Sequence, residues 1–298
     1  MALLPGQGVL MVGHGTVGDI EELPEFLTKI RRGRPYPEQL LSELVHRYRT
    51  IGGSPLLTVT QRQAELLSDR LGVPVLVGMR FAGPDIGRAL EQASSLGISE
   101  LCILPVAPFS VHIYARVVVE ACEERHLSLK LRPVDAWGTE PQLIAAHVQS
   151  IRSVLAGLGS ATRLILTAHS LPLSVVRAGD PYPAEVQACA QAIGAQLGEA
   201  YELCYQSQGA DGGQWLGPDV LESIRNKAGE GNPSVTVAPI GFVADHVETL
   251  YDLDVEAAGL AQDLGLAFHR VPALNTHPKL VAAMAEVVGR TMRPGYDP

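Results

Sequence analysis

The sequence predicts an α/β protein built from two similar Rossmann-like halves, each a roughly four-stranded parallel sheet flanked by helices, with a ligand cleft between them. Short apolar runs alternate with longer amphipathic stretches, which is typical of βαβ units. The runs are continuous, as in strands covered on both faces, and their order occurs twice. With 46% of its 298 residues hydrophobic, the chain can form two cores of about 150 residues each. We place them at residues 1–155 and 156–298.

The strands and helices follow from local pattern. The expected strands are residues 8–12, 73–79, 100–106 and 129–134 in the first half, and 163–168, 202–207, 234–240 and 265–271 in the second. Helical stretches lie between them, and several begin with proline and end near glycine. Clear examples are residues 37–50, 84–97 and 183–198.

Two histidines end equivalent strands of the two halves. "VLMVGHGT" contains His14 and "LILTAHSL" contains His169, each flanked by small residues. Ligands of parallel sheets bind beyond the carboxyl ends of the strands, so we expect these histidines to face each other across the cleft. "GHGTVG" also fits the dinucleotide pattern G-x-G-x-x-G, but the next strand candidate begins only near Val73, too far for that motif. We therefore expect these glycines to let the backbone approach a flat ligand closely.

Composition excludes several classes of function. The net charge is −9 and the 23 basic residues are scattered except at 31–34, which argues against nucleic-acid binding. The first residues lack a basic signal region, and no apolar run reaches the roughly 18–20 residues of a membrane span. The four cysteines form no C-x-x-C pair, so we expect free thiols in a reducing cytoplasm, no iron-sulfur cluster and no permanent cofactor.

An acidic series follows the strand at 234–240. Glu248, Asp252 and Glu256 are spaced by four residues, so a continuous helix would place three carboxylates on one face at a small cost to its stability. The preceding strand opens toward the same end of the sheet as the His169 strand. A histidine opposite carboxylates suits proton removal or the handling of a hard cation. A solvated acidic face is the alternative interpretation.

Three long blocks resemble the signature blocks of ferrochelatases: "TAHSLP", "YQSQGADGGQWLGPDV" and "PIGFVADHVETLYDLDVE". The similarity continues through "IRRGRPYP", "YRTIGGSPL", "GDPYP" and "NTHPKLVAAMAEVV", and so covers nearly the whole chain. The resemblance implies a lyase of haem biosynthesis that inserts ferrous iron, as a substrate, into a porphyrin held in the cleft. It implies that His169 is the active-site histidine and Glu248 its carboxylate partner. Asp252 and Glu256 match an acidic line that guides metal or protons.

The same resemblance implies contacts in the first half. The first arginine of "IRRGRP", Arg31, matches a residue lying over the porphyrin, and Ser54 and Tyr114 match residues that contact propionates. Arg47 matches a basic residue near a peripheral metal site. These residue types suit the reaction, because imidazole, with a pKa of about 6.5, accepts protons or binds metal. Carboxylates hand over an ion that thiolates would retain.

The substrate follows from the segment "FLTKIRRGRPYP". It resembles the compact, polar branch that uses coproporphyrin III rather than the membrane-associated branch that uses protoporphyrin IX, so coproporphyrin III is favoured. One residue departs from this pattern. The compact branch commonly has tyrosine at the position of His14, whereas "GHG" is similar to the small chelatases that act on sirohydrochlorin. We expect His14 to contact the porphyrin and to ligate the metal from the face opposite His169.

Two other classes stay open at this point. A sirohydrochlorin cobalt or iron chelatase would share the fold and the histidines. A non-catalytic haem-binding protein would keep the cleft without needing the acidic series. Because haem is insoluble and reactive, we also expect a transient partner that accepts the product.

Overall fold

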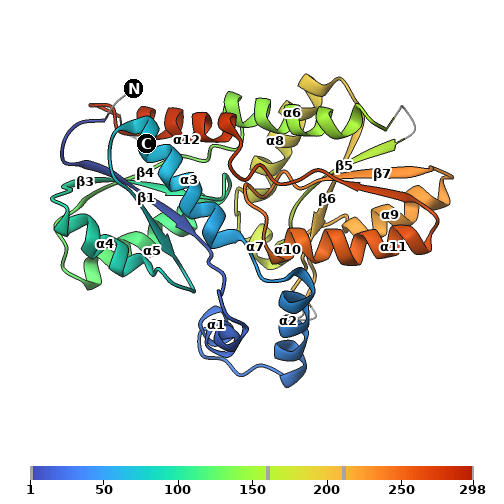
Figure 1. Cartoon of the computed structure of the whole chain (residues 1–298), viewed down its shortest axis with the longest axis horizontal. Helices are drawn as coiled ribbons and strands as arrows, with labels where there is room; N and C mark the ends of the chain where they lie inside the picture. Colours follow the sequence, from blue (N-terminus) through green and yellow to red (C-terminus); the bar gives the residue numbers. More distant parts are fainter. Residues whose placement is uncertain (1–2, 159–161, 210–212, 297–298) are drawn as a thin grey trace. The chain divides into compact units, whose positions relative to one another are not determined.

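The computed structural model describes residues 3–158, 162–209 and 213–296. They form two compact units, the first made of Met1–Trp137 with Val281–Pro298 and the second of Gly138–Leu280. Unit 1 contains a four-stranded sheet of order β2-β1-β3-β4, and unit 2 one of order β6-β5-β7-β8 (Figure 1). The strand order is the same when each unit is counted along the chain. The predicted duplicated α/β architecture is therefore confirmed.

The sheet of unit 1 is parallel throughout. Its strands are β1 (Gln7–Gly13), β2 (Val75–Met79), β3 (Glu100–Pro105) and β4 (Lys130–Pro133). Every residue of the central strand β1 is buried, which explains its continuous apolar run. Side chains of α4 (Ile86–Ser95) and α5 (Val111–Glu124) pack with those of β1 and β3 in one core.

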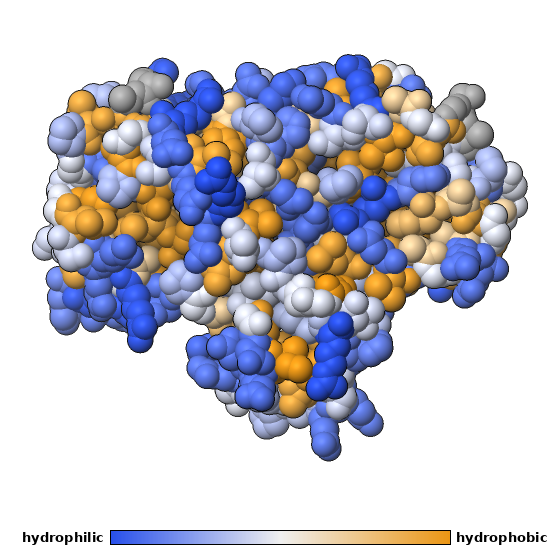
Figure 2. Space-filling view, in the orientation of Figure 1, coloured by the Kyte–Doolittle hydropathy of each residue, from blue (hydrophilic) through white to orange (hydrophobic). Residues whose placement is uncertain are grey.

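The remaining helices of unit 1 follow β1 and close the chain. The turn η1 (Ile20–Glu22), α1 (Leu23–Ile30) and α2 (Glu38–Ile51) precede α3 (Leu56–Leu71). The last helix, α12 (Pro278–Thr291), belongs to unit 1 from Val281 onward. In Figure 2 the surface over α1 and α2 is hydrophilic around a hydrophobic group at its centre. Among the described residues that expose a large apolar side chain, none lies within 20–51.

The sheet of unit 2 is also parallel. Its strands are β5 (Thr162–His169), β6 (Tyr201–Gln206), β7 (Ser234–Ala238) and β8 (Ala267–Arg270). The helices are α6 (Pro141–Leu155), α7 (Leu173–Arg177), α8 (Tyr182–Leu197), α9 (Val220–Gly229), α10 (Val247–Leu250), a π-helix (Asp252–Ala257) and α11 (Ala258–Asp263).

The observed boundary between the two units differs from the boundary that we predict from the sequence. The units divide after Trp137, whereas residues 1–155 and 156–298 were expected. The difference is α6, which packs against α8 of unit 2, and the C-terminal helix, which returns to unit 1. A helix between two strands carries the same amphipathic pattern whichever sheet it covers, so sequence does not assign it. No helix of the described residues has both the length and the apolarity needed to cross a membrane.

Candidate active site

In unit 2 a carboxylate lies between two histidines at the carboxyl edge of the sheet. His169 is the last residue of β5, and Glu248 lies in the first turn of α10, whose N-cap is His246. The Nε2 atom of His169 is 3.4 Å from Oε1 of Glu248, and the Nε2 atom of His246 is 3.4 Å from Oε2. The side chains of His169 and Glu248 are 34% and 33% exposed. The pair is therefore accessible to a ligand.

The pair is charged at neutral pH. Burial alone would lower the pKa of His169, but the charge of Glu248 and its hydrogen bond outweigh burial and raise that pKa to about 9. Burial would likewise raise the pKa of the Glu248 carboxyl, yet the charges and hydrogen bonds of His169 and His246 hold it well below its usual range. The resting arrangement is an imidazolium beside a carboxylate.

The ends of β5 and β6 hold this pair in place. The Gln206 amide, which is 1% exposed, donates to the backbone carbonyl of Glu248 at 3.0 Å. Its oxygen accepts a hydrogen bond from the Thr167 hydroxyl at 2.8 Å. The Tyr182 hydroxyl donates to the backbone carbonyl of His169, also at 2.8 Å. Buried side-chain hydrogen bonds of this kind fix orientation as well as stability.

The acidic series does not lie on one α-helix, as expected, but on α10 and a π-helix that continues into α11 (Figure 1). The amide of Glu256 donates to the carbonyl of Tyr251, five residues earlier, at 3.0 Å. Such wide turns are frequent at functional sites. The carboxylates also differ: Asp252 is buried and accepts a hydrogen bond from Ser207 at 2.5 Å, whereas Glu256 is exposed. A uniformly solvated acidic face is thus excluded.

In unit 1, His14 follows β1 and is exposed. Its ring meets those of Phe81 and Phe26 edge-on, with centroids 4.8 and 6.3 Å away. The Phe81 amide donates to the carbonyl of His14 at 3.0 Å. The guanidinium carbon of Arg80 lies 4.7 Å from the Phe81 ring centroid, within the range of a cation–π contact. One aromatic ring therefore contacts both His14 and an arginine.

Gly13 and Gly15, on either side of His14, allow the backbone to pack closely against β2 and the turn after it. A Cβ atom on Gly13 would lie 2.9 Å from Sδ of Met79. Gly15 has φ of +101°, and its Cβ would lie 3.1 Å from the amide nitrogen of Ala82. The expectation that these glycines make room for a flat ligand is thus not supported, because at both positions the close neighbour is the turn after β2 or its last residue. Gly18 has open space.

The other predicted residues of unit 1 lie on four segments. Arg31 follows α1 and donates to the Pro35 carbonyl at 3.2 Å, and Arg47 of α2 pairs with Glu43 at 2.7 Å. Ser54 precedes α3, and its buried hydroxyl oxygen has no hydrogen-bond partner within the described ranges. Tyr114 lies half-buried on α5. That these residues and His14 face the His169 side of a cleft stays a prediction.

Three neighbours of the His169–Glu248 pair could not be predicted from the sequence. His246, Gln206 and Ser207 all lie within the blocks that carry the family resemblance, but their types gave no separate signal. His246 stands two residues before Glu248, a spacing that separates side chains within a helix but here brings them together across the helix start. In the part of the chain with a described structure, no group of three or more His, Cys, Asp or Glu side chains is arranged to hold a metal ion.

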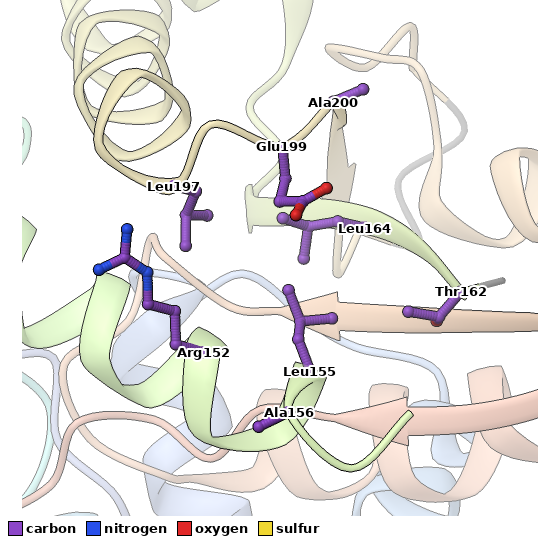
Figure 3. Close-up of a pocket in the computed structure, with 8 residues that line it drawn as sticks. All are labelled: Arg152, Leu155, Ala156, Thr162, Leu164, Leu197, Glu199 and Ala200. Atoms are coloured by element: carbon purple, nitrogen blue, oxygen red, sulfur yellow. The ribbon is translucent and has the colours of Figure 1, made fainter. Parts of the chain in front are cut away.

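A surface depression of about 540 Å³ in unit 2 lies away from these residues (Figure 3). It is lined by the ends of α6 and α8 and by the start of β5, including Arg152, Leu155, Thr162, Leu164, Leu197 and Glu199. Thr162 begins β5 and His169 ends it. The depression thus belongs to the opposite edge of the sheet from the His169–Glu248 pair.

The fold, two units that each contain a four-stranded parallel sheet of the same strand order, places the chain among α/β proteins whose architecture is shared with solved structures of chelatases. The structure is similar to SirB from Bacillus subtilis with Fe3+, with a TM-score of 0.63 and 14% identity over 96% of this chain and 95% of that one. It is also similar to CbiX, the terminal enzyme of sirohaem biosynthesis in denitrifying bacteria, with a TM-score of 0.55 and 17% identity over 95% and 98% of the two chains. At these identities the likeness shows the fold alone.

Sequence comparison narrows the class to a family. The Ferrochelatase family model matches residues 6–292. A ferrochelatase of Acidobacterium capsulatum is 34% identical over 303 residues, covering 94% of this chain and 92% of the relative. A coproporphyrin III ferrochelatase of Anoxybacillus flavithermus is 36% identical over 305 residues, covering 96% of both. The chain belongs to the ferrochelatase family, as its signature blocks predict.

Proposed function

We propose that this chain inserts ferrous iron into coproporphyrin III, with protoporphyrin IX a poorer substrate, as a lyase of haem biosynthesis in the cytoplasm. The observation that carries the proposal is the Glu248 carboxylate between two imidazoles, a third of it exposed, with His169 3.4 Å away. Metallation requires two pyrrole N–H protons to leave the porphyrin, so the site must accept protons beside an incoming divalent ion. A carboxylate flanked by histidines supplies both an acceptor and a route for those protons.

The charges of His169 and Glu248 determine the order of the proton transfers. Glu248 is the group able to accept a proton first, because His169, with a pKa of about 9, already carries one at neutral pH. An iron ion close to Glu248 offsets the negative charge that keeps His169 protonated. Only the Ser170 carbonyl and the charge of Asp252 then oppose burial, so the pKa of His169 falls and the ring loses its proton and becomes a base or ligand. His246, on the other side of Glu248, is placed to take the released proton onward.

The acidic residues beyond Glu248 supply the metal route in this proposal. Asp252, held by Ser207 at 2.5 Å, is the inner carboxylate and the exposed Glu256 the outer one. Arg47 lies near the peripheral metal position. Oxygen ligands suit an ion that must be released again, since they bind iron less strongly than thiolates do. Iron is a substrate here, and the proposal includes no resident cofactor or iron-sulfur cluster.

Residues of unit 1 bind the porphyrin in this proposal. Arg31 lies over the ring, and Ser54 and Tyr114 hydrogen-bond to propionates; the buried Ser54 hydroxyl, which lacks a partner within the described ranges, supports this role. The absence of a large exposed apolar side chain among the described residues 20–51 favours coproporphyrin III, whose four propionates need more polar partners than the two of protoporphyrin IX. His14 ligates the iron of the haem product, which a transient partner then accepts.

An anaerobic assay tests the proposal. Ferrous iron is supplied with coproporphyrin III, protoporphyrin IX or sirohydrochlorin, and metallation is followed by absorbance. We expect the highest kcat/KM with coproporphyrin III. A preference for sirohydrochlorin would indicate the other chelatase class, and tight haem binding without metallation of any substrate would leave a binding protein.

A further inference from the structure

A second set of side chains, outside the reacting groups, holds the start of α10. Asp245 is 8% exposed, and both of its carboxylate oxygens are engaged. Oδ1 accepts hydrogen bonds from Nη1 of Arg270 at 2.7 Å and from the Thr249 hydroxyl at 3.0 Å, while Oδ2 accepts from Nδ2 of Asn275 at 2.8 Å. The Asp245 amide donates to Oδ1 of Asn275, also at 2.8 Å. The carboxylate thus links the end of β8, the turn after it and α10.

Thr249 connects this set to His246. Its side chain is fully buried, and its hydroxyl accepts a hydrogen bond from the His246 amide at 3.0 Å. The same hydroxyl has one proton, which it can donate to Asp245 at 3.0 Å or to the His246 carbonyl at 3.1 Å. The carboxylate is the stronger acceptor because it is charged. One hydroxyl therefore bridges a fixed carboxylate and the N-cap of the helix.

The helix needs such support. α10 comprises only Val247–Leu250 and is the first turn of a helical segment that continues through the π-helix into α11. The first amides of a helix have no acceptor within the helix, so this end is held only by contacts from outside it. Its position decides the geometry of the candidate site, since it places the side chains of His246 and Glu248 against each other and that of Glu248 against His169.

We infer that Thr249 is a positioning residue, which, with Asp245 and Arg270, fixes the turn that carries His246 and Glu248. Asp245 then acts as a permanent anchor rather than a carrier of protons, because both of its oxygens are occupied by donors. The catalytic part of this inference rests on the proposed function, whereas the structural part does not.

The test compares Thr249→Val, Thr249→Ser and a matched control. Valine keeps the size of threonine but removes the hydroxyl, so this substitution deletes the hydrogen bonds and changes the volume little. Serine keeps the hydroxyl. Thr236→Val is the control: Thr236 is also fully buried, and its hydroxyl is 2.9 Å from that of Thr162, in β7 away from α10.

Two measurements are made on each variant. In the anaerobic assay with coproporphyrin III we expect Thr249→Val to lower kcat about tenfold, as misplaced catalytic groups do, with the porphyrin KM within about twofold. Thr249→Ser restores kcat, and Thr236→Val leaves it unchanged at a similar loss of thermal stability. By mass spectrometry, amide hydrogen exchange over residues 244–251 should be about fivefold or more faster in Thr249→Val than in the control.

The inference is overturned if Thr249→Val matches Thr236→Val in both measurements, or if Thr249→Ser is as impaired as Thr249→Val. Should Thr249→Val fail to fold, Arg270→Gln, which removes the ion pairs to Asp245 and Asp254, must raise exchange over the same residues. Unchanged exchange in that variant would contradict the anchoring role. If the wild-type chain metallates no tetrapyrrole, the proposed function fails and the exchange data alone decide the inference.

Discussion

Replacing Glu248 by Gln removes the charge that keeps His169 protonated, while the size of the side chain and its ability to hydrogen-bond are retained. Burial lowers the pKa of His169, and the charge and hydrogen bond of Glu248 contribute most to raising it to about 9, ahead of the Ser170 carbonyl and the charge of Asp252. In Glu248→Gln only these two weaker contributions oppose burial, so the pKa of His169 should fall to the ordinary histidine value of about 6.5 or below it. The resting imidazolium would then become a neutral imidazole at pH 7.

The size of the effect follows from the pKa. A rise from 6.5 to about 9 corresponds to roughly 3 kcal/mol, at about 1.4 kcal/mol for each pKa unit. The side chains of His169 and Glu248 are 34% and 33% exposed, so water and salt screen the pair. We therefore expect about 1–2 kcal/mol of the difference to appear in the free energy of unfolding.

The sign of the pH dependence is fixed by the two pKa shifts. The raised pKa of His169 gives a stabilisation that is fully present below about pH 6.5 and is lost as the pH rises through about 9. The depressed pKa of Glu248 gives one that is present above its ordinary value of about 4.5 and is lost as the pH falls below it. Wild type and Glu248→Gln should therefore differ most in stability between about pH 5 and 6.5, and least above about pH 9.5.

An NMR titration of the histidine rings measures the effect, with the His169 signal assigned from its loss in His169→Asn. Glu222→Gln is the control, because Glu222 is an exposed carboxylate on α9 of the same unit. A His169 pKa near 9 in Glu248→Gln, or near 6.5 in the wild type, would refute the account of the pair. Turnover is measured in parallel: Glu248→Gln should abolish most metallation while porphyrin binding persists, and unchanged turnover would remove Glu248 from the mechanism.

Three further changes address other parts of the site. His14→Ala should alter the axial-ligand bands in the absorption spectrum of the haem-bound protein, and identical spectra would exclude ligation by His14. Gly15→Ala should destabilise unit 1 by about 1–3 kcal/mol in thermal unfolding, because its φ is +101° and a residue with a side chain is strained there. Gly18→Ala is the control and should have little effect, because a Cβ atom at Gly18 meets open space. Equal losses of stability in the two variants would contradict this prediction. Ser207→Ala removes the 2.5 Å hydrogen bond to Asp252 and should raise the KM for iron several-fold more than that for porphyrin; a change in the porphyrin KM alone would argue against the metal route.

Much of the fold could be predicted because local pattern and burial coincide. The strand candidate at 8–12 is continuous and apolar, and it became the fully buried centre of its sheet, β1. The helix at 183–198 was marked by Pro183 and Gly198, and α8 spans Tyr182–Leu197 with Gly198 in a left-handed conformation after it. These features depend on neighbours along the chain, which the sequence displays.

Other features depend on distant contacts and could not be predicted. The spacing of Glu248, Asp252 and Glu256 fits an α-helix, but the backbone adopts a wide π turn at Asp252–Ala257. The hydrogen bond from Ser207 to Asp252 spans two elements whose approach no local pattern reports. His246 was missed for the same reason, because its proximity to Glu248 requires the helix to begin between them.

The two units show how one architecture supports different chemistry at equivalent places. β1 and β5 occupy the same position in their sheets, and each leads to a histidine at its carboxyl end. The segment after β7 forms α10 and brings a carboxylate to 3.4 Å from His169, whereas the turn after β2 brings the Phe81 ring to 4.8 Å from His14. A carboxylate favours the charged imidazolium, while an aromatic ring packed edge-on supplies no formal charge. The duplicated fold thus sets where a histidine stands, and the connecting segments decide whether a carboxylate or an aromatic ring lies against it.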